Sequence, residues 1–290
     1  SYPREDEKAE MEEFRACCGG PAATAMVALS RLGVSAAFLG SISDDPFGLD
    51  ILAHLRRERL DVSHLKIAPG CTSQFSFIAV NQSGGKRTIF WHRGSAPPLS
   101  PKDVDLDSYR NARVLHVDGL MLEASVEAAL QAKALGMTVV MDAGTMREGA
   151  GELTRLVDVL VASRTFAQPL VGPNASPLDA LHALETLCPG RIVITMGSSG
   201  SIGLDGSEII RQKAFPVEAV DTTGAGDVFH GAYIYGILRG WSMARCMRFS
   251  SAAAALKCRN AWDEGNGMPD LHSVLRMSDA VRKEKAEAEK

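Results

Sequence analysis

The sequence lacks any apolar run long enough to cross a membrane. A transmembrane helix needs about 20 consecutive apolar residues, and no stretch of the 290 residues approaches that length. Residues 1–14 (SYPREDEKAEMEEF) are acidic and polar, unlike a secretory signal. An excess of positive charge is also missing, because 31 Lys and Arg against 35 Asp and Glu give a net charge of −4. We therefore expect neither a membrane nor a nucleic acid as partner.

The cysteines and histidines lack the spacing of a metal site. None of the six cysteines stands in a Cys-x-x-Cys pair, and the adjacent Cys17 and Cys18 suit neither a zinc site nor a disulfide framework. The seven histidines show no metal-ligand spacing, so we expect His116 and His230 to pack or to support neighbouring groups. Reduced thiols that pack as small apolar side chains predict a cytoplasmic protein.

What the sequence does contain is an alternation of short apolar strands and helices. Residues 21–33 have helical spacing and end at a glycine, and residues 35–42 (SAAFLGSI) follow as an expected buried strand. From residue 111 onward the alternation returns, with four strand-like segments: RVLHVDGL, TVVMDAG, VDVLVAS and RIVITMG. These segments carry too few polar residues for a sheet with one wet face. The pattern therefore predicts a three-layer α/β/α domain with a mostly parallel central sheet.

Residues 72–93 interrupt this alternation. TSQFSFIAV and KRTIFWHR are strand-like, and the segment NQSGG between them is typical of a hairpin turn. We therefore expect a small β-sheet that projects from the main domain. In open parallel sheets, ligands bind beyond the carboxyl ends of the strands. The site candidates are therefore the residues that follow predicted strands: Asp118, Asp142, Ser163 and Gly197–Gly200.

The stretch DTTGAGDVFHGAYIYGIL (221–238) joins a glycine turn to an apolar helix. Gly224, Ala225 and Gly226 leave backbone N–H groups without helical partners, and their small size permits close approach of an anion. The carboxylate of Asp227 would repel an anion bound at these amides. Its presence makes sense if the amides hold a phosphate and the carboxylate contacts the hydroxyl that attacks the phosphorus. The alternative is a glycine turn with an acidic helix cap, because the usual nucleotide motifs, Gly-x-Gly-x-x-Gly and the P-loop, are absent.

The same stretch resembles a family signature. VDTTGAGDVFHGAY is similar to the C-terminal signature of the ribokinase-like (PfkB) carbohydrate kinases, and CGGPAATAMVALSRLG resembles their N-terminal signature. SISDDPFGLDILAHLRRERLDVSHL continues the pattern, while YPREDEKAEMEEFRACCGG, KRTIF and MDAGTMREG resemble ketohexokinase-like members. The resemblance covers nearly the whole chain. It implies a ribokinase-like fold, ATP, Mg²⁺ and transfer of the γ-phosphoryl group to a hydroxymethyl of a small, ketohexose-like sugar.

The resemblance also implies a role for each site residue. Asp227 is the general base, and the amides of Gly224, Ala225 and Gly226 form the anion hole. Two residues of the same turn would help to hold a monovalent cation such as K⁺, with a plain turn and helix cap as the alternative: Asp221 and Thr223. The implied nucleotide-phosphate residues are Ser163, Thr195, Gly197 and Gly200. The implied sugar contacts are Asp6, Gly19, Gly20, Thr24 and Arg87, the last of which could equally be a solvated charge.

This chain departs from the family pattern in three places. Thr24 stands where many relatives have an asparagine that binds sugar hydroxyls. Residues 163–166 (SRTF) replace an Asn-x-x-Glu pattern near the metal and the phosphates, a pattern that ketohexokinase-like members also lose. The family's first strand, with a sugar-binding aspartate, would precede Tyr2; either further residues precede this sequence or that contact is missing.

In the family the small sheet is a lid. The resemblance implies lid segments at residues 1–20 and 69–95, and a main nucleotide-binding and catalytic domain at 21–68 and 96–290. It further implies a homodimer formed through the lid. Phe90 and Trp91 would either cover the sugar or form the subunit contact.

Two alternatives to a ketohexose kinase stay open. The acceptor could be a nucleoside, a sugar acid, or a sulfonated or phosphorylated ketose, and basic residues beside the sugar would favour an anionic one: Lys8, Arg87 and Arg93. Outside the enzymes, the alternative is a non-catalytic sugar or nucleotide sensor on the same fold. An assay of ATP consumption separates the two, because a sensor would bind its ligand without forming ADP.

Overall fold

The computed structural model describes residues 5–80, 87–260 and 267–288. Within these residues the central sheet has six strands in the order β10-β9-β8-β7-β6-β5. Strands β5 to β8 are parallel, and β9 and β10 are antiparallel additions at one edge. The expected mostly parallel sheet is therefore confirmed. The strands are β5 (Val114–Val117), β6 (Thr138–Ala143), β7 (Val159–Ser163), β8 (Arg191–Thr195), β9 (Ser201–Asp205) and β10 (Glu208–Gln212).

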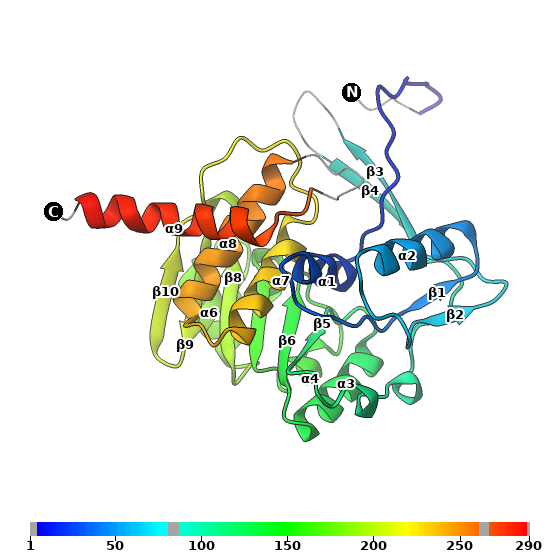
Figure 1. Ribbon diagram of the computed structural model, residues 1–290, viewed down its shortest axis with the longest axis horizontal. Helices are drawn as coiled ribbons and strands as arrows, with labels where there is room; N and C mark the ends of the chain where they lie inside the picture. Colours follow the sequence, from blue (N-terminus) through cyan, green and yellow to red (C-terminus); the bar gives the residue numbers. More distant parts are fainter. Residues whose placement is uncertain (1–4, 81–86, 261–266, 289–290) are drawn as a thin grey trace.

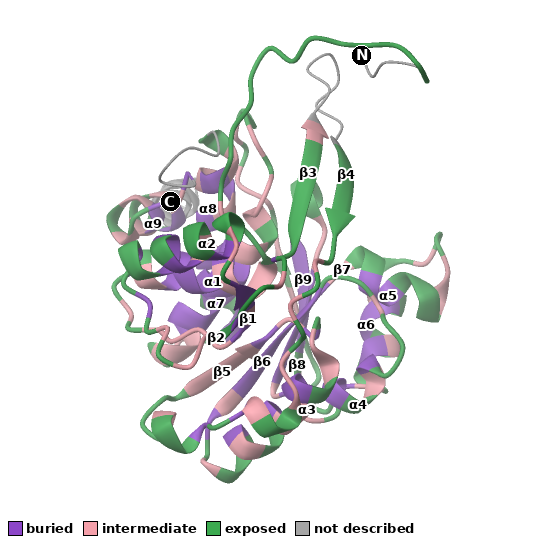
Figure 2. Ribbon diagram, turned by 90° about the vertical axis from the view of Figure 1, so that its right-hand side faces the viewer, coloured by how far each residue is buried: buried purple, intermediate pink, exposed green. Residues whose placement is uncertain are grey.

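Helices cover both faces of the sheet, which completes the three-layer α/β/α arrangement (Figures 1 and 2). One layer contains α1 (Pro21–Arg31), α7 (Ala225–Leu238), α8 (Met243–Arg259) and α9 (Leu271–Ala288). The opposite layer contains α3 (Leu122–Ala134), α4 (Ala150–Thr154), α5 (Arg164–Val171) and α6 (Pro177–Glu185). No helix in the described parts of the chain is both long and apolar enough to span a bilayer.

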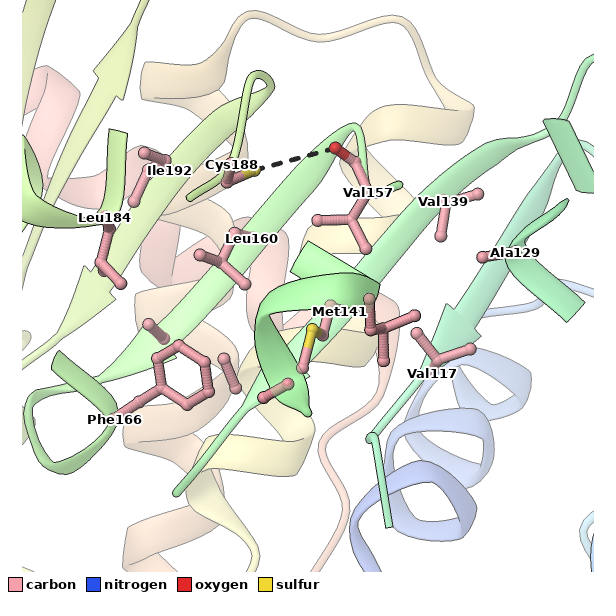
Figure 3. Packing of buried hydrophobic residues seen from close by; sticks show 14 of the residues in the cluster. Val117, Ala129, Val139, Met141, Val157, Leu160, Phe166, Leu184, Cys188 and Ile192 are labelled. Carbon is pink, nitrogen blue, oxygen red and sulfur yellow. Dashed lines mark hydrogen bonds between the residues drawn. The ribbon is translucent and has the colours of Figure 1, made fainter. Parts of the chain in front are cut away.

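Two hydrophobic cores lie on the two faces of the sheet because successive strand side chains point in opposite directions. Leu160 of β7 faces the layer of α3 to α6, whereas Val161 faces α1, α7 and α8. Figure 3 shows the first of these cores, in which Leu160 lies on the same side of the sheet as Phe166 and Leu184. Each fully buried side chain of this size contributes about 1.5–3 kcal/mol. The cores therefore hold the strand ends, and the residues that follow them, in fixed positions.

Helix α7 is buried on all sides from Val228 to Gly236. Two glycines permit close packing there. A Cβ on Gly231 would collide with the carbonyl oxygen of Ala25 in α1, and one on Gly236 would collide with Cys246 in α8. Because the contact between Gly231 and Ala25 lies within two turns of the start of each helix, the beginnings of α1 and α7 come to the same region of the molecule.

The expected hairpin is confirmed as strands β3 (Phe75–Val80) and β4 (Arg87–His92), which pair antiparallel in a separate sheet. Figure 2 shows this sheet projecting from the main domain. The NQSGG turn between the strands lies outside the described residues. In the segment expected to join this sheet, the described residues 5–20 contain no strand.

The buried strand expected over residues 35–42 is shorter than predicted. Only β1 (Ser41–Ser43) forms, and it pairs parallel with β2 (Lys66–Ala68) outside the central sheet, with a single further bridge between Ala37 and Asp61. The segment has a neighbouring strand on one side for only these few residues, which is why most of it stays irregular. Helix α2 (Pro46–Arg57) follows, capped by Asp45, whose carboxylate accepts from the Gly48 N–H at 2.8 Å.

Candidate active site

The carboxyl ends of β7 and β8 place two predicted residues side by side. Ser163 and Thr195 are register partners in the parallel pair. The Ser163 hydroxyl donates to the Gly144 carbonyl at 2.7 Å and accepts from the Phe166 N–H at 3.2 Å, so it ties β6 to β7 and caps α5. The Thr195 hydroxyl donates to the Ala162 carbonyl at 3.3 Å. The structure thus brings both together at the predicted edge and gives each hydroxyl a structural bond.

The turn after β8 needs its glycines for different reasons. Gly200 has a φ of 87°, and a Cβ there would collide with the Gln212 carbonyl oxygen, so the turn itself requires glycine. Gly197 has a φ of 57°, but a Cβ would meet no heavy atom within 4 Å. The open space beside Gly197 is the feature expected where another molecule approaches the backbone.

The 221–224 loop is fixed by backbone hydrogen bonds. The N–H groups of Val220 and Asp221 both donate to the Cys258 carbonyl at the end of α8, at 2.8 and 3.2 Å. The Thr223 N–H donates to the Asp221 carboxylate at 2.8 Å, which makes an Asx-type turn, in line with the plain turn given as the alternative to a cation site. Gly224 follows in the left-handed region, with φ of 73°, as the N-cap of α7. The loop therefore presents the first turn of α7 in a defined orientation.

Asp227 is the third residue of α7 and is half-buried, so its carboxylate does not lie in the hydrophobic interior. The residue before it, Gly226, is exposed, has no left-handed φ, and would place a Cβ where no heavy atom lies within 4 Å. Neither backbone conformation nor packing against the described residues requires glycine there. The missing side chain leaves the start of the helix accessible to an anion. The Ala225 N–H donates to the Thr222 carbonyl at 3.3 Å.

Two of the predicted sugar contacts, Gly19 and Gly20, lie in the segment before α1. Burial raises the pKa of the Cys17 thiol to about 11, with further contributions from Cys18 and from the Asp221 carboxylate, while Lys257 acts in the opposite direction. Gly19 and Gly20 directly precede α1, whose beginning comes to the same region as the beginning of α7 through the contact between Gly231 and Ala25. A Cβ on Gly19 or Gly20 would meet no heavy atom within 4 Å.

The three other predicted sugar contacts are Asp6, Thr24 and Arg87. Asp6 is exposed. Thr24 is only 3% exposed, its N–H donates to the Gly20 carbonyl at 2.9 Å, and it borders a very narrow cavity together with Gly19. Arg87 begins β4, and its side chain lies outside what the structure describes.

A buried polar cluster lies beneath the first turn of α7. His230 approaches the Gly226 carbonyl oxygen, the Val161 carbonyl oxygen and the Asp142 carboxylate, and the rings of His230 and His116 have centroids 5.7 Å apart. Burial, followed by the nearby His230, lowers the pKa of His116 to about 3. The packed or supporting role predicted for both histidines agrees with these positions.

Asp118, at the end of β5, is a further acidic group at the same sheet edge. Burial raises its pKa, and the Asp142 charge acts in the same direction, whereas the N–H groups of Leu120 and Ala22 lower it. The bond from Ala22 joins Asp118 to the start of α1. The position of Asp118 and Asp142 after strands marked them as site candidates. Their link to α1 and α7 could not be found from the sequence.

A cavity of about 420 Å³ opens beside the 221–224 loop. Its lining comes from the segment before the loop, from the end of α8 and from the first half of α9: Pro216, Val217, Glu218, Val220, Arg259 and Met277. The volume is within the usual range of about 300–1,000 Å³ for small-molecule sites. Among the residues that the structure describes, no group of three or more His, Cys, Asp or Glu could hold a metal ion.

Comparisons with known proteins give a consistent result. A model of the pfkB family of carbohydrate kinases matches residues 1–264. The chain is 29% identical to 5-dehydro-2-deoxygluconokinase of Clostridium perfringens, over 96% of this chain and 88% of that protein. It is 28% identical to ketohexokinase of Mus musculus, over 89% and 90%. The structure of Arabidopsis thaliana ribokinase complexed with ribose and ATP superposes with a TM-score of 0.83 at 25% identity, covering 96% of this chain and 93% of that one.

Proposed function

The chain belongs to the pfkB family of carbohydrate kinases, and we propose that it transfers the γ-phosphoryl group of ATP to a hydroxymethyl group of a ketohexose-like sugar. One observation carries the proposal. The first turn of α7 presents a half-buried carboxylate, Asp227, directly after Gly226, whose missing side chain leaves the helix end open. A carboxylate beside an anion-binding site can serve catalysis when it contacts the attacking alcohol, whose proton it accepts, rather than the anion.

In the proposed reaction Asp227 accepts the proton of the sugar hydroxyl as that oxygen attacks the γ-phosphorus. The bond between the γ-phosphorus and the bridging oxygen of ATP breaks, and ADP leaves. The amides of Gly224, Ala225 and Gly226 donate to the oxygens of the transferring phosphoryl group, where negative charge develops. Gly19 and Gly20, directly before α1, allow the sugar to approach the backbone closely.

The residues present are compatible with ATP and Mg²⁺. The cavity is lined by Val220, whose N–H shares the Cys258 carbonyl with that of Asp221, and we propose it as the nucleotide site. Bound Mg²⁺ would neutralise charge on the phosphates. It commonly keeps several waters and binds through one or two carboxylates plus substrate phosphates, which agrees with the lack of a larger ligand cluster among the described residues. We place the predicted K⁺ near Asp221 and Thr223.

The acceptor is tested by measuring ADP formation with Mg-ATP across a panel of sugars. We expect the largest kcat/KM with a ketohexose and a higher rate with K⁺ than without it. The panel also contains ribose, 5-dehydro-2-deoxygluconate, a sulfonated ketose and a nucleoside, since relatives at 28–29% identity carry different substrate names. A faster reaction with an anionic acceptor would replace the ketohexose assignment. Binding of sugar without any ADP would contradict the kinase proposal itself.

We also propose that the β3–β4 sheet forms a homodimer. Its apolar side chains are exposed on both faces, with Ile89 at 50% and Trp91 at 49% on one face and Phe90 at 60% on the other. Burying such a surface in a second copy is favourable by about 25 cal/mol per Å² of apolar area. A cytoplasmic location belongs to the same proposal, because the cysteines are free thiols, which are typical of a reducing compartment.

We expect the Ile89→Asp variant to be monomeric and wild type to be dimeric by sedimentation velocity. A buried charge at the centre of an apolar interface is strongly unfavourable. The matched control is Leu130→Asp on α3, because Leu130 is similarly exposed, at 49%, but lies far from the projecting sheet. A dimeric Ile89→Asp protein would place the interface elsewhere.

A further inference from the structure

His230 connects the first turn of α7 to the central sheet. Its Nδ1 lies 2.7 Å from the Gly226 carbonyl oxygen, one helical turn earlier. Its Nε2 lies 3.3 Å from the Val161 carbonyl oxygen in β7 and 3.5 Å from the Asp142 carboxylate at the end of β6. The side chain is only 6% exposed, so water does not compete for these bonds. The ring is thus held between the helix and two strands.

The bond to Gly226 acts on the peptide group that precedes Asp227. The Gly226 carbonyl and the Asp227 N–H belong to one planar peptide unit, so a bond that fixes the carbonyl also fixes the direction of that N–H. Gly226 has no side chain to restrict its backbone, and glycine loses more conformational freedom on ordering than any other residue. A hydrogen bond from a side chain to the Gly226 carbonyl therefore reduces conformational freedom at the most flexible residue of the turn.

The second ring nitrogen fixes the turn relative to the sheet. Nε2 lies beside the Val161 carbonyl oxygen of β7 and the Asp142 carboxylate of β6, so the ring contacts both strands as well as the helix. His116 packs near the same ring and brings no positive charge, because burial keeps its pKa low. Since β6 and β7 also carry the Gly144–Ser163 bond, the helix turn and the strand ends become parts of one rigid frame.

We propose that His230 is a positioning residue for phosphoryl transfer, which aligns the Gly226–Asp227 peptide group and the adjoining amides with the transferring phosphate through its bond to the Gly226 carbonyl. The inference rests on the proposed role of the 224–227 turn. Preorganised donors act mainly on the transition state, where the charge on the phosphoryl oxygens changes. Loss of the alignment therefore lowers kcat more than it raises either KM.

Two substitutions separate the two bonds of His230. In His230→Asn the side-chain amide occupies the place of Nδ1 and can still donate to Gly226. In His230→Gln it occupies the place of Nε2 and can donate to Val161 but not to Gly226. We expect His230→Gln to lower kcat by about 10- to 100-fold, less than or equal to the loss of a whole oxyanion donor. We expect His230→Asn to stay within about threefold of wild type in kcat, because it keeps the bond that aligns the turn.

A second measurement needs no acceptor. Amide hydrogen exchange of the first turn of α7, followed by mass spectrometry, should be faster in His230→Gln than in wild type, and unchanged in His230→Asn. If His230→Gln does not fold, Asp142→Asn is measured instead, because this substitution weakens the contact between His230 and strand β6. It should lower kcat several-fold at unchanged KM; an unchanged kcat in that variant would overturn the proposal.

The outcomes distinguish this inference from the proposed function. Asp227→Ala is measured in parallel. Full turnover in Asp227→Ala would remove the general-base role while leaving the hydrogen-exchange test of His230 intact. If Asp227→Ala is inactive but His230→Gln has wild-type kcat and exchange, His230 does not position the turn. Equal losses in His230→Asn and His230→Gln would likewise overturn the assignment to the Gly226 bond.

Discussion

Asp227→Asn should lower kcat for sugar phosphorylation by a factor of about 10²–10⁴, the usual contribution of a general base. Asparagine has the size of aspartate and can still hydrogen-bond the sugar hydroxyl, but it cannot accept its proton. Because Asp227 is half-buried at the start of α7 rather than in a core, the fold should be retained. The measurements are steady-state kinetics, thermal unfolding and calorimetric titration with Mg-ATP, and the affinity for ATP should change little.

The control for Asp227→Asn is the same substitution at a remote carboxylate. Asp107 is exposed and begins a 3₁₀ turn (Asp107–Tyr109), where its carboxylate forms an ion pair with Arg110, the C-cap of the turn. Exposed pairs of this kind contribute about 0–1 kcal/mol, so Asp107→Asn should leave kcat and the unfolding temperature unchanged. Near wild-type turnover in Asp227→Asn would falsify the general-base assignment, whereas loss of ATP affinity together with folding would show a structural role.

The second large effect concerns Gly226. Gly226→Ala should lower kcat/KM by about 10²–10³, comparable to the loss of one oxyanion donor, because the new methyl group occupies the space where the phosphate approaches. The same change should leave the protein as stable or more stable. Alanine in a helix is favoured over glycine by about 0.5–1 kcal/mol, and here a Cβ meets no heavy atom within 4 Å. A variant that gains stability while losing activity indicates a site shaped for a ligand.

Gly151 supplies a closely matched control. Like Gly226 it is the second residue of a helix, has no left-handed φ, and would place a Cβ in open space. It belongs to α4, in the helix layer on the opposite side of the sheet. Gly151→Ala should therefore show the same small change in the free energy of unfolding with unchanged kinetics. If both variants keep full activity, the open space at Gly226 does not hold a phosphate.

Some of the residues at the carboxyl edge of the sheet could be predicted, because the ends of the strands follow from local sequence patterns. Apolar runs of four to six residues between helical segments are typical of parallel strands, and β5 to β8 form where these runs stand. The hairpin β9–β10 was missed, although the Gly206-Ser207 pair between its strands is a turn signal and Gly206 has a φ of 60°. The apolar run SIGLD was too short to distinguish from a continuation of the preceding turn.

By itself the sequence determined the parallel sheet, the projecting hairpin, and the glycine turn with its carboxylate at the start of α7. Each depends on residues that are neighbours in the chain, through periodicity, chain reversal or helix capping. Only the tertiary structure decided that Thr24 is buried, and that His230 links Gly226 to Val161 and Asp142. These contacts join segments far apart in the chain. They depend on how closely α7 packs between the sheet and α1, which local patterns do not encode.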